Sequence, residues 1–394
     1  MDIMTCMETP AAWSSFEEAL LAGGHLSRRE EKMLREYITR EGYRPILKSI
    51  RRGEAFGFPE RIEINKKSTG KKRVVYRFED DQNLFLKMLG HQLHRFDGIF
   101  TPNLYSFRRG RSARTAIESL TKRWNPQGKY VYKVDIHDYF NSIDINRLLP
   151  VLRETLGTED TETCNFLEQL LREDRVYVRK YASEKKRGRS RKFGASTDAP
   201  DEEFSVVRDD HRGIMAGTPT ASFLANLYLR EMDEYFFRNR IRYARYSDDI
   251  IVFADSAEKR EEYRLKILDT LAEKCLTVNP RKEASWNPGE SWDFLGVSCN
   301  GREVDLTDIA REKVKGKIKR KARAFRRWKC RKNVEDTAAI RAYFRYFNRK
   351  FYENPVQNEL TWSRWYFPLL TTDTSLHEID RYLTENARYR ATGH

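Results

Sequence analysis

The segment RYSDDIIVFAD, residues 245–255, places two adjacent aspartates between a short apolar approach and a β-branched run. β-Branched residues favour strands, so the segment predicts a β-hairpin with Asp248 and Asp249 near its tip. A solvated turn is one explanation of the pair, because aspartate hydrogen-bonds its own backbone and tolerates unusual backbone angles. A bound cation is the other explanation, because adjacent carboxylates repel each other. A further carboxylate on a neighbouring strand would favour the cation.

The segment YVYKVD, residues 130–135, supplies such a carboxylate. Side chains alternate along a strand, so Val131, Lys133 and Asp135 share one face, and Asp135 falls where the strand ends. If this strand pairs antiparallel with the hairpin, Asp135 approaches Asp248 at the rim of the sheet. Clustered carboxylates suit hard cations, and two Mg²⁺ ions about 4 Å apart are typical of phosphoryl transfer. The pattern therefore predicts a metal site that activates a primer 3′-hydroxyl and neutralises departing pyrophosphate.

Composition indicates a globular chain with a polyanionic partner. The 394 residues are 39% hydrophobic and 12% aromatic, which is enough to build two or three packed subdomains. The net charge is +15 although 34% of residues are charged, so the basic excess needs a partner. Aromatic residues interleaved with basic ones favour nucleic acid over a membrane surface.

The cysteines and the N-terminal segment bear on the compartment. No Cys-x-x-Cys pair occurs, which argues against a zinc knuckle or a disulfide framework and indicates a reducing compartment. No run approaches the ~18 apolar residues of a membrane span, and MDIMTCMETPAAW lacks the features of a signal peptide. We therefore expect a soluble, cytoplasmic protein with no membrane partner. The cysteines are Cys6, Cys164, Cys275, Cys299 and Cys330.

Helical periodicity and turn residues predict the remaining elements. A hairpin is expected at residues 62–78, with lysines and Arg73 around its Ser-Thr-Gly turn. A polar, basic segment at 180–212 is expected to be a mobile loop or insertion. A Gly-rich turn at 214 is expected to lead into one long helix. Helices are expected over 1–55, 80–96, 146–171 and 256–275 and through the basic chain after 306.

Several segments along the chain occur as an ordered set of motifs. Three of them are DIHDYFNSI (135–143), GIMAGTPTASFLANLYL (213–229) and YSDD (246–249). The others are LYSFRRGRSARTAI (104–117), WDFLGV (292–297) and LHEIDRYLTENAR (376–388). Each motif is weak alone, whereas their order and spacing are specific. Together they resemble the reverse transcriptases of bacterial group II introns and retrons over roughly residues 60–390: the first three resemble the palm motifs, and the others a finger motif, the primer grip and the end of a thumb.

The resemblance implies an α+β fold, the right-hand polymerase, with fingers, a palm built on an antiparallel sheet with helices, and a helical thumb. We expect the insertion to lie within the palm and to become ordered on RNA. The expected domains are an N-terminal helical cap (1–55), fingers (56–129), palm (130–300) and a basic thumb or C-terminal region (301–394).

The resemblance also assigns roles at the metal site. Asp135 and Asp248 are the expected metal ligands, and Asp249 is the supporting acid. The backbone carbonyl of Ile136 is a further expected ligand. The implied cofactor is a pair of Mg²⁺ ions, for which Mn²⁺ can substitute.

Five further positions match residues that contact the incoming nucleotide. Phe140 matches a steric gate, the bulky ring that collides with a ribose 2′-hydroxyl; a core aromatic is the alternative. Arg73 matches a triphosphate clamp, because a planar guanidinium binds phosphate oxygens in a fork, and Lys66 is expected to assist it. Gly217 allows close backbone approach. Lys282 matches a lysine proposed to protonate pyrophosphate, although a plain surface lysine explains it equally well.

Basic residues near the motifs and in the thumb are candidates for nucleic-acid contact. In the finger turn these are Arg108, Arg109 and Arg111, where Arg108 contacts template, nucleotide or simply phosphate, and Tyr246 precedes the aspartates.

Residues 311–332 form a dense basic segment with Val314, Ile318, Ala322 and Phe325 as a thin apolar stripe at helical spacing. Such dense like charge is self-repelling without a polyanion, although a solvated surface helix is the alternative. The thumb candidates are Lys319, Lys321, Arg323 and Arg327.

At two places the sequence departs from the group II intron and retron pattern, and these departures indicate a subgroup of the reverse transcriptases. The related enzymes usually carry Pro-Gln-Gly before the helix of the second palm motif (motif B, residues 213–229), where this chain has Met215, Ala216 and Gly217. The retron Val-Thr-Gly near the thumb is also absent, and residues 296–306 read GVSCNGREVDL. These features resemble the stand-alone, defence-associated reverse transcriptases of bacteria, formerly called the unknown group, which typically work with a dedicated noncoding RNA.

We therefore expect an RNA-directed DNA polymerase that extends a primer with deoxynucleoside triphosphates, copying a noncoding RNA into nascent DNA in antiphage defence. A homo-oligomer or a second defence protein is a further expected partner. Alternatives are a template-independent or protein-primed polymerase of the same fold, and an enzyme derived from a retron or group II intron. A catalytically inactive RNA-binding scaffold is a third class, against which the intact aspartates argue.

Overall fold

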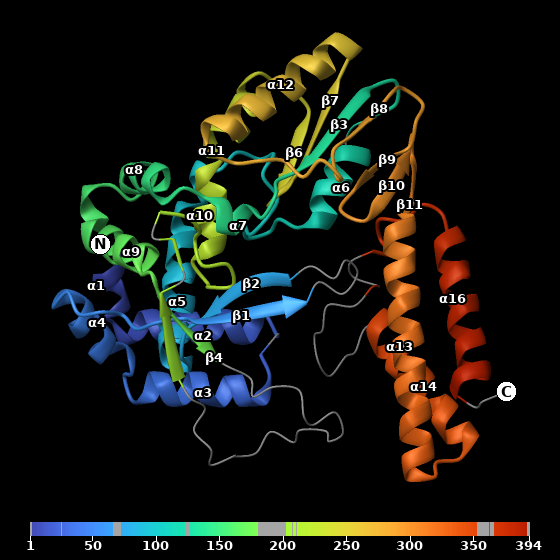
Figure 1. The fold of residues 1–394 in the computed structure, drawn as a ribbon, viewed down its shortest axis with the longest axis horizontal. Coiled ribbons are helices and arrows are strands. Elements are labelled where there is room, and N and C mark those ends of the chain that lie inside the picture. The colour runs from blue at the N-terminus through green and yellow to red at the C-terminus, as the bar shows by residue number, and fades with distance from the viewer. Residues whose placement is uncertain are drawn as a thin grey trace.

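The computed structural model places two four-stranded sheets and their covering helices beside a C-terminal layer of helices (Figure 1). It describes residues 2–24, 26–65, 72–122, 124, 126–179, 202–206, 208–209, 211–352, 362 and 366–391.

The four-stranded sheet that carries the aspartates has the strand order β6-β7-β3-β8. All three pairings in it are antiparallel, as predicted for the two aspartate-bearing segments. β3 is buried on both faces, with Val131, Tyr132 and Val134 all buried, and it ends at its aspartate. The strands are β3 (Tyr130–Asp135), β6 (Tyr243–Tyr246), β7 (Asp249–Ala254) and β8 (Ala284–Trp286).

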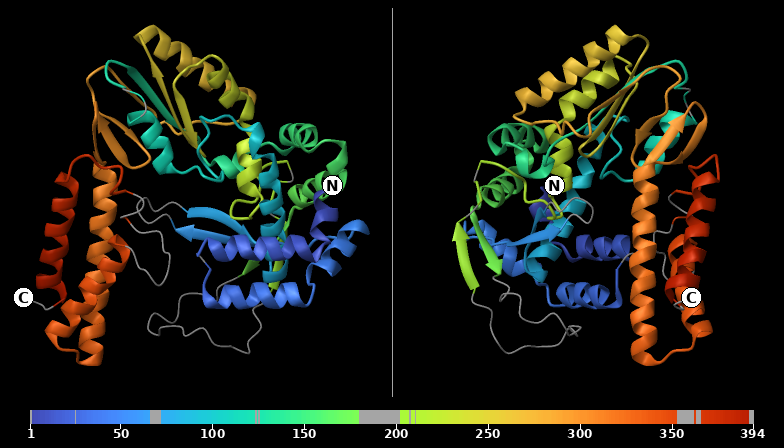
Figure 2. Two further views of the ribbon diagram at one scale, coloured as in Figure 1. Left: turned by 180° about the vertical axis from the view of Figure 1, so that it is seen from behind. Right: turned by 45° about the vertical axis from the view of Figure 1, so that its right-hand side comes forward.

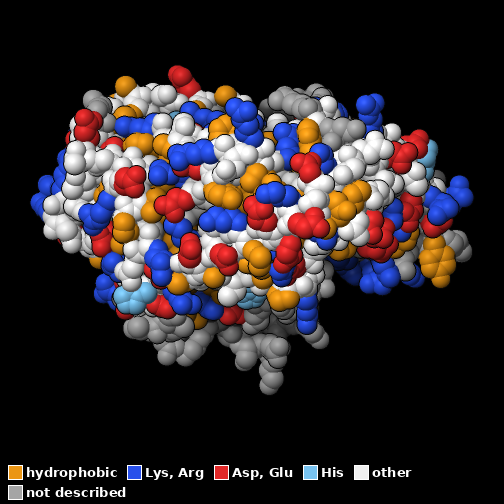
Figure 3. Space-filling view, turned by 90° about the horizontal axis from the view of Figure 1, so that it is seen from above, with side chains coloured by type: hydrophobic (Ala, Val, Ile, Leu, Met, Phe, Trp, Pro, Cys, Tyr) orange, Lys and Arg blue, Asp and Glu red, His pale blue; other side chains and the backbone are white. Residues whose placement is uncertain are grey.

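Helices cover both faces of this sheet (Figures 1 and 2). The long helix α12 (Ala257–Glu273) packs on β3 and β7 and buries Ile267 and Leu271. α6 (Ala113–Thr121) packs on the other face through Ile117 and Leu120. On the surface of the molecule that is seen from above, the basic and acidic side chains of the described residues are interspersed (Figure 3).

A second sheet, of order β2-β1-β4-β5, forms the fingers side of the molecule. Its predicted hairpin is confirmed, with the turn itself outside the described residues. The predicted insertion at 180–212 also lies mostly outside them, but part of it is strand β5, which pairs with β4. That strand was not predicted, because its polar sequence lacks the apolar alternation of a half-buried strand. The strands are β1 (Glu60–Asn65), β2 (Lys72–Arg77), β4 (Arg175–Arg179) and β5 (Glu202–Val206).

The N-terminal region is helical, as predicted, and packs against α5 (Asp80–Leu93). Trp13 is fully buried and stacks on Tyr43 with ring centroids 4.8 Å apart. A capping box between Ser27 and Glu30 begins the third helix. These helices are α1 (Ile3–Met7), α2 (Pro10–Ala22), α3 (Arg28–Thr39) and α4 (Tyr43–Arg51).

Two predicted long helices are each broken in two. The helix expected at 146–171 stops at Gly157, whose φ of +73° suits glycine, and it forms α8 (Ile145–Leu156) and α9 (Thr161–Arg172). The helix expected after 214 is likewise two, α10 (Ala221–Tyr228) and α11 (Arg230–Arg238). Both parts of each pair keep an apolar face, so periodicity alone did not reveal the breaks.

The C-terminal part is a separate helical layer beside the palm and fingers (Figure 2). α13 (Asp308–Lys332), α14 (Asp336–Phe351) and α16 (Thr374–Asn386) share one apolar core. α13 is joined to the palm through a small sheet of order β11-β10-β9. Its strands are β9 (Trp292–Phe294), β10 (Val297–Asn300) and β11 (Glu303–Leu306). No described helix is both long and apolar enough to cross a bilayer.

Candidate active site

Strand register brings the predicted aspartates together. Asp135, the last residue of β3, lies directly opposite Asp249, the first residue of β7. The Ile136 amide donates to the Asp248 carbonyl at 3.0 Å, which ties the end of β3 to the hairpin turn. The Asn279 amide donates to the Asp135 carbonyl at 2.8 Å. Backbone hydrogen bonds therefore fix all three aspartates at one edge of the sheet.

The turn before the aspartates has an unusual backbone. Ser247 is buried and has a φ of +60°, a region that non-glycine residues adopt only when the surroundings hold them there. Its amide donates to Ser106 Oγ at 2.9 Å. A side chain from the finger motif therefore helps to hold the turn that carries Asp248.

A fully buried ion pair lies behind this turn. The Arg245 guanidinium is 0% exposed and pairs with Asp233 of α11, with Nη2 and Oδ2 2.5 Å apart. Arg245 also donates to the Ser247 carbonyl at 3.3 Å and to the Asn226 carbonyl at 3.2 Å. The Tyr243 hydroxyl donates to Asp233 at 2.9 Å. This cluster joins β6, α10 and α11 to the catalytic turn.

Burial and like charge act on the carboxylates themselves. Burial raises the pKa of Asp249 to about 6; the Lys133 charge opposes that rise and Asp248 adds to it. Burial also raises the pKa of Asp248, with a further contribution from Asp135. Lys282 forms an ion pair with Asp135, and Lys133 Nζ lies 3.9 Å from Asp249 Oδ1. Negative charge is thus concentrated here and only partly offset by lysines.

The donor set is the kind that hard cations prefer. The carboxylates repel one another in a partly desolvated setting, which a divalent cation would relieve. In the side-chain conformations of this structure, no three or more His, Cys, Asp or Glu among the described residues are grouped so that they could hold a metal ion. Asp135 instead faces Lys282. The oxygen donors fit Mg²⁺ in chemical type, and binding would require Lys282 to release Asp135.

The sequence profile of the reverse transcriptase (RNA-dependent DNA polymerase) family matches residues 64–299, which include all three aspartates. The chain belongs to the reverse transcriptase family. It has the right-hand polymerase fold of that family.

Solved structures of telomerases resemble this reverse transcriptase at low identity. Apo telomerase from Candida tropicalis is 12% identical, with a TM-score of 0.46, over 84% of this chain and 63% of that chain. Candida albicans telomerase in complex with a TWJ fragment of telomeric RNA is 13% identical, with a TM-score of 0.41, over 85% and 61%. The reverse transcriptase thus spans less than two thirds of the length of these telomerases. No curated protein matches its sequence.

The nucleotide side of the site contains Phe140 and the motif-B turn. Phe140 is half-buried beside the short helix start at Tyr139, and its carbonyl accepts from the Ile214 amide at 2.9 Å. Gly217 has a φ of +101°, and a Cβ there would lie 3.1 Å from the Tyr76 carbonyl of β2. The Ala216 carbonyl accepts from the Tyr76 amide at 2.7 Å. Only glycine permits this close contact between motif B and the fingers hairpin.

Arg73 and Lys66 were both predicted to bind the triphosphate. Arg73 is exposed on β2. Burial raises the pKa of Asp248, and the positive charge of Arg73 lowers it. Arg73 therefore lies close enough to the aspartates for its charge to act on them. Lys66 lies outside the described residues.

The finger-motif arginines have protein partners. The Arg108 guanidinium donates to the carbonyls of Thr101 at 2.8 Å and Asp97 at 3.0 Å. Arg109 contacts the His91 ring at 3.3 Å, and Arg111 lies over the Tyr105 ring at 5.6 Å. Of the three, Arg109 is the exposed one, and the half-buried Arg108 holds the local backbone.

The thumb candidates differ in their surroundings. The stripe of Val314, Ile318 and Ala322 is buried, and Phe325 is partly buried, as predicted. Arg323 and Arg327 are exposed and line a shallow concavity of about 620 Å³ together with neighbouring arginines. Lys319 is half-buried, and Lys321 Nζ lies 3.8 Å from the Tyr346 ring centroid. Basic residues at the two ends of α13 pair with acidic ones, so charge repulsion is partly relieved within the protein.

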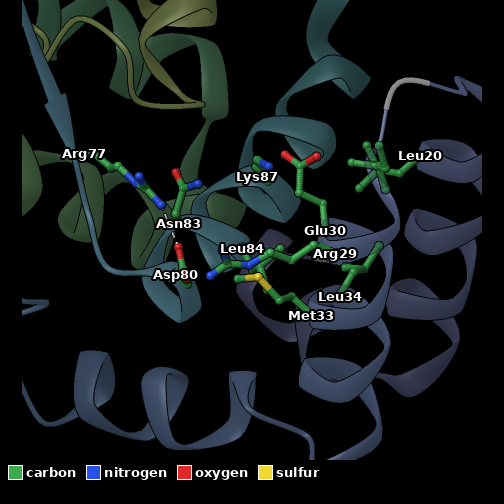
Figure 4. Close-up of a pocket in the computed structure, with 11 residues that line it drawn as sticks. Leu20, Arg29, Glu30, Met33, Leu34, Arg77, Asp80, Asn83, Leu84 and Lys87 are labelled. Atoms are coloured by element: carbon green, nitrogen blue, oxygen red, sulfur yellow. Dashed lines mark hydrogen bonds and ion pairs between the residues drawn. The ribbon is translucent and has the colours of Figure 1, made fainter. Parts of the chain in front are cut away.

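A separate cavity of about 280 Å³ lies between the N-terminal helices and α5 (Figure 4). Leu34, Met33 and Leu84 supply apolar walls. Arg77 and Asp80 form an ion pair at its edge, with Nη2 and Oδ1 2.9 Å apart. None of the candidate active-site residues lines it.

Sequence reasoning missed the residues that hold the site. The sequence gives Arg245 no role beyond its place in the hairpin, and it marks neither Asp233 nor Ser106 as a site residue. An arginine inside an otherwise apolar strand is a signal of a buried partner, since a buried charge is costly unless paired. The partner itself lies twelve residues away on a helix, and nothing in the sequence links the two.

Proposed function

We propose that Asp135, Asp248 and Asp249, with the carbonyl of Ile136, hold two Mg²⁺ ions for DNA synthesis, and that Mn²⁺ can replace them. The observation that carries this proposal is the register that places Asp135 opposite Asp249 beside the Asp248 turn. The ions would lower the pKa of the primer 3′-hydroxyl and neutralise charge on the leaving pyrophosphate. The aspartates orient the site, and their fixed backbone leaves little to reorganise.

Other side chains would select and hold the nucleotide. Arg73 would grip the triphosphate in a fork, with Lys66 assisting. Phe140 would exclude a ribose 2′-hydroxyl, and Gly217 would let the nucleotide approach the backbone of motif B. Lys282 would give a proton to pyrophosphate after metal binding has released its ammonium from Asp135.

Two regions of the chain are proposed to contact nucleic acid: the fingers and palm, and the thumb. We propose Arg108, Arg109, Arg111 and Tyr246 on the template side of the fingers and palm. In the thumb we propose Lys319, Arg323 and Arg327. Lys321 was also expected to bind nucleic acid, but its ammonium lies over the Tyr346 ring, and we propose that it stabilises the thumb instead. The fingers, palm and thumb boundaries at 56–129, 130–300 and 301–394 remain part of this proposal, as does the cap at 1–55.

The proposed biological role is synthesis of DNA on a dedicated noncoding RNA in bacterial antiphage defence, in the cytoplasm. Support comes from the motif-B departure at Met215 and Ala216 and from the basic excess of the chain. A second copy of the chain or another defence protein is the proposed protein partner. Sequencing the RNA and DNA that co-purify with the protein tests this role; random cellular RNA in place of one enriched species would contradict it.

A second candidate is synthesis without an external template or from a protein primer. The observation that favours it concerns Ala216, which occupies the place of the template-contacting glutamine. Ala216 is buried, and its carbonyl accepts a hydrogen bond from the Tyr76 amide. No side chain at this position can reach a template base.

One experiment separates these functions. Purified protein is incubated with each labelled deoxynucleotide and ribonucleotide, with and without added RNA template and primer. Incorporation of the nucleotide complementary to the template, lost on omission of RNA, supports RNA-directed synthesis. Incorporation independent of RNA supports the second candidate, and label covalently attached to the protein identifies a protein primer. Absence of any incorporation by the protein with its co-purified RNA and Mg²⁺ would contradict both.

A further inference from the structure

Phe107 is the most unusual apolar residue near the site. Its side chain is 39% exposed, although phenylalanine is large and apolar. Its backbone φ is +54°, a region that costs a bulky residue free energy and is found mainly where the surroundings enforce it. Exposure and backbone strain in the same residue, beside a polymerase site, indicate that its position serves a purpose.

The neighbours of Phe107 hold it in this position. Ser106 is fully buried, and its Oγ donates to Asn226 Oδ1 at 3.1 Å while accepting from the Ser247 amide at 2.9 Å. The Asn226 side-chain amide donates to the Ser106 carbonyl at 2.9 Å. On the other side, Arg108 donates to the carbonyls of Thr101 and Asp97. Residues 106 and 108 are therefore both anchored, and the ring between them is directed outward.

The Phe107 ring contacts the ring proposed to select the sugar. The centroids of Phe107 and Phe140 are 6.1 Å apart with an interplanar angle of 88°, an edge-to-face pair. Phe140 also packs edge-to-face on Tyr139 at 5.8 Å, and Tyr139 is itself buried with its hydroxyl bound to the Ala225 carbonyl. Phe140 thus contacts both a fixed tyrosine and Phe107. Tyr246 is a further neighbour of Phe107, with ring centroids 6.5 Å apart.

We propose that Phe107 is a positioning residue for sugar selection, which it performs by bracing the Phe140 ring. This inference rests on the proposed role of Phe140 as steric gate. A ring excludes a 2′-hydroxyl only if it cannot rotate away when the hydroxyl presses on it. Edge-to-face contacts with Tyr139 and Phe107 both restrict rotation of the Phe140 ring.

The experiment measures kcat/KM for one deoxynucleotide and for the matching ribonucleotide on a single RNA template and primer. The Phe140→Ala variant should lose most of the discrimination between them. Phe107→Ala and Phe107→Leu should each lower the discrimination roughly two- to tenfold, the factor that an edge-to-face ring pair corresponds to. Phe107→Tyr keeps the aromatic ring, so its ratio of deoxynucleotide to ribonucleotide kcat/KM should equal that of wild type. A general defect of folding would not change this ratio in the Ala and Leu variants and leave it unchanged in the Tyr variant.

The double variant Phe107→Ala/Phe140→Ala identifies the route of the effect. Bracing predicts that, once Phe140 is removed, removing Phe107 changes the ratio no further. An equal change in both backgrounds would overturn the inference, because Phe107 would then act on the nucleotide or template directly. Phe237→Ala is the matched control, since Phe237 is a 47% exposed aromatic on α11, and its ratio should equal that of wild type.

The remaining outcomes separate this inference from the function on which it rests. If Phe140→Ala changes the ratio and the Phe107 variants do not, the bracing inference is wrong and the gate stands. If Phe140→Ala leaves the ratio unchanged while the enzyme still polymerises, the gate proposal fails and the inference falls with it. Thermal unfolding of each variant shows whether it is folded, and Phe107→Leu keeps the inference testable if Phe107→Ala does not fold.

Discussion

The palm hairpin and the thumb helix α13 both concentrate charge of one sign, but they stabilise it differently. In the hairpin, Asp248 and Asp249 sit on a backbone fixed by buried partners, above all the Arg245–Asp233 ion pair. In α13, a narrow apolar stripe is buried, and the exposed Arg323 and Arg327 have no ion-pair partner among the described residues. Buried contacts therefore fix the positions of the hairpin carboxylates, whereas Arg323 and Arg327 lie exposed on the surface of α13. Substitutions should affect the two regions in different measurements.

The largest expected effect is on catalysis in the hairpin. Asp248→Asn together with Asp249→Asn should lower nucleotide incorporation by about a thousandfold or more, since metal-assisted charge stabilisation contributes several kcal/mol. Folding and RNA affinity should change little, because the substitutions relieve repulsion between carboxylates. Primer extension and RNA binding are measured on the same preparation. Extension at more than a trace of the wild-type rate would refute the metal-site assignment.

A second substitution tests the buried support of the hairpin. Arg245→Met leaves the Asp233 carboxylate buried without its partner, so the free energy of unfolding should fall by about 3–5 kcal/mol. Denaturant unfolding measures this change. The control is Arg245→Met together with Asp233→Leu, which removes both charges and should recover much of the loss. Equal destabilisation by the single and double variants would mean that shape, and not charge, matters at this position.

The contrast also explains which parts could be predicted from the sequence. The strands ending at Asp135 and beginning at Asp249 were predictable because alternation and β-branched residues depend on local sequence, and their pairing follows from the shared carboxylate chemistry. The Arg245–Asp233 pair and the Ser106 anchor were not, because each joins residues distant in the chain through contacts that leave no local pattern. The breaks at Gly157 and Leu229 were missed because the apolar face continues across them.

The thumb prediction concerns affinity and not chemistry. Alanine at Lys319, Arg323 and Arg327 should flatten the log-log salt dependence of RNA affinity by roughly two to three units, since each phosphate contact contributes about 0.7 to 0.9. The buried stripe is untouched, so folding should be retained. Incorporation at saturating RNA and low salt should fall far less than in the aspartate variant.

The control for the thumb variant removes the same charge elsewhere. Lys32, Arg238 and Lys259 are at least 54% exposed and lie on α3, α11 and α12. Alanine at all three should leave the salt slope close to wild type. A similar flattening in both variants would mean that total charge, and not the α13 surface, governs RNA binding.

The smallest expected effect distinguishes Lys321 from its neighbours on α13. Its ammonium lies 3.8 Å from the Tyr346 ring centroid, within the range of a cation–π interaction. Lys321→Gln should therefore lower the free energy of unfolding by about 0.5–1 kcal/mol. In a double-mutant cycle, Tyr346→Leu should reduce this cost without abolishing it, because the Lys321 ammonium also lies 5.4 Å from the Phe325 ring centroid. A lysine committed to a ring on α14 stabilises the thumb itself, so Lys321→Gln alone should leave the salt slope almost unchanged. A loss of one full phosphate contact from the slope, with no change in stability, would instead assign Lys321 to the RNA-binding surface with Arg323 and Arg327.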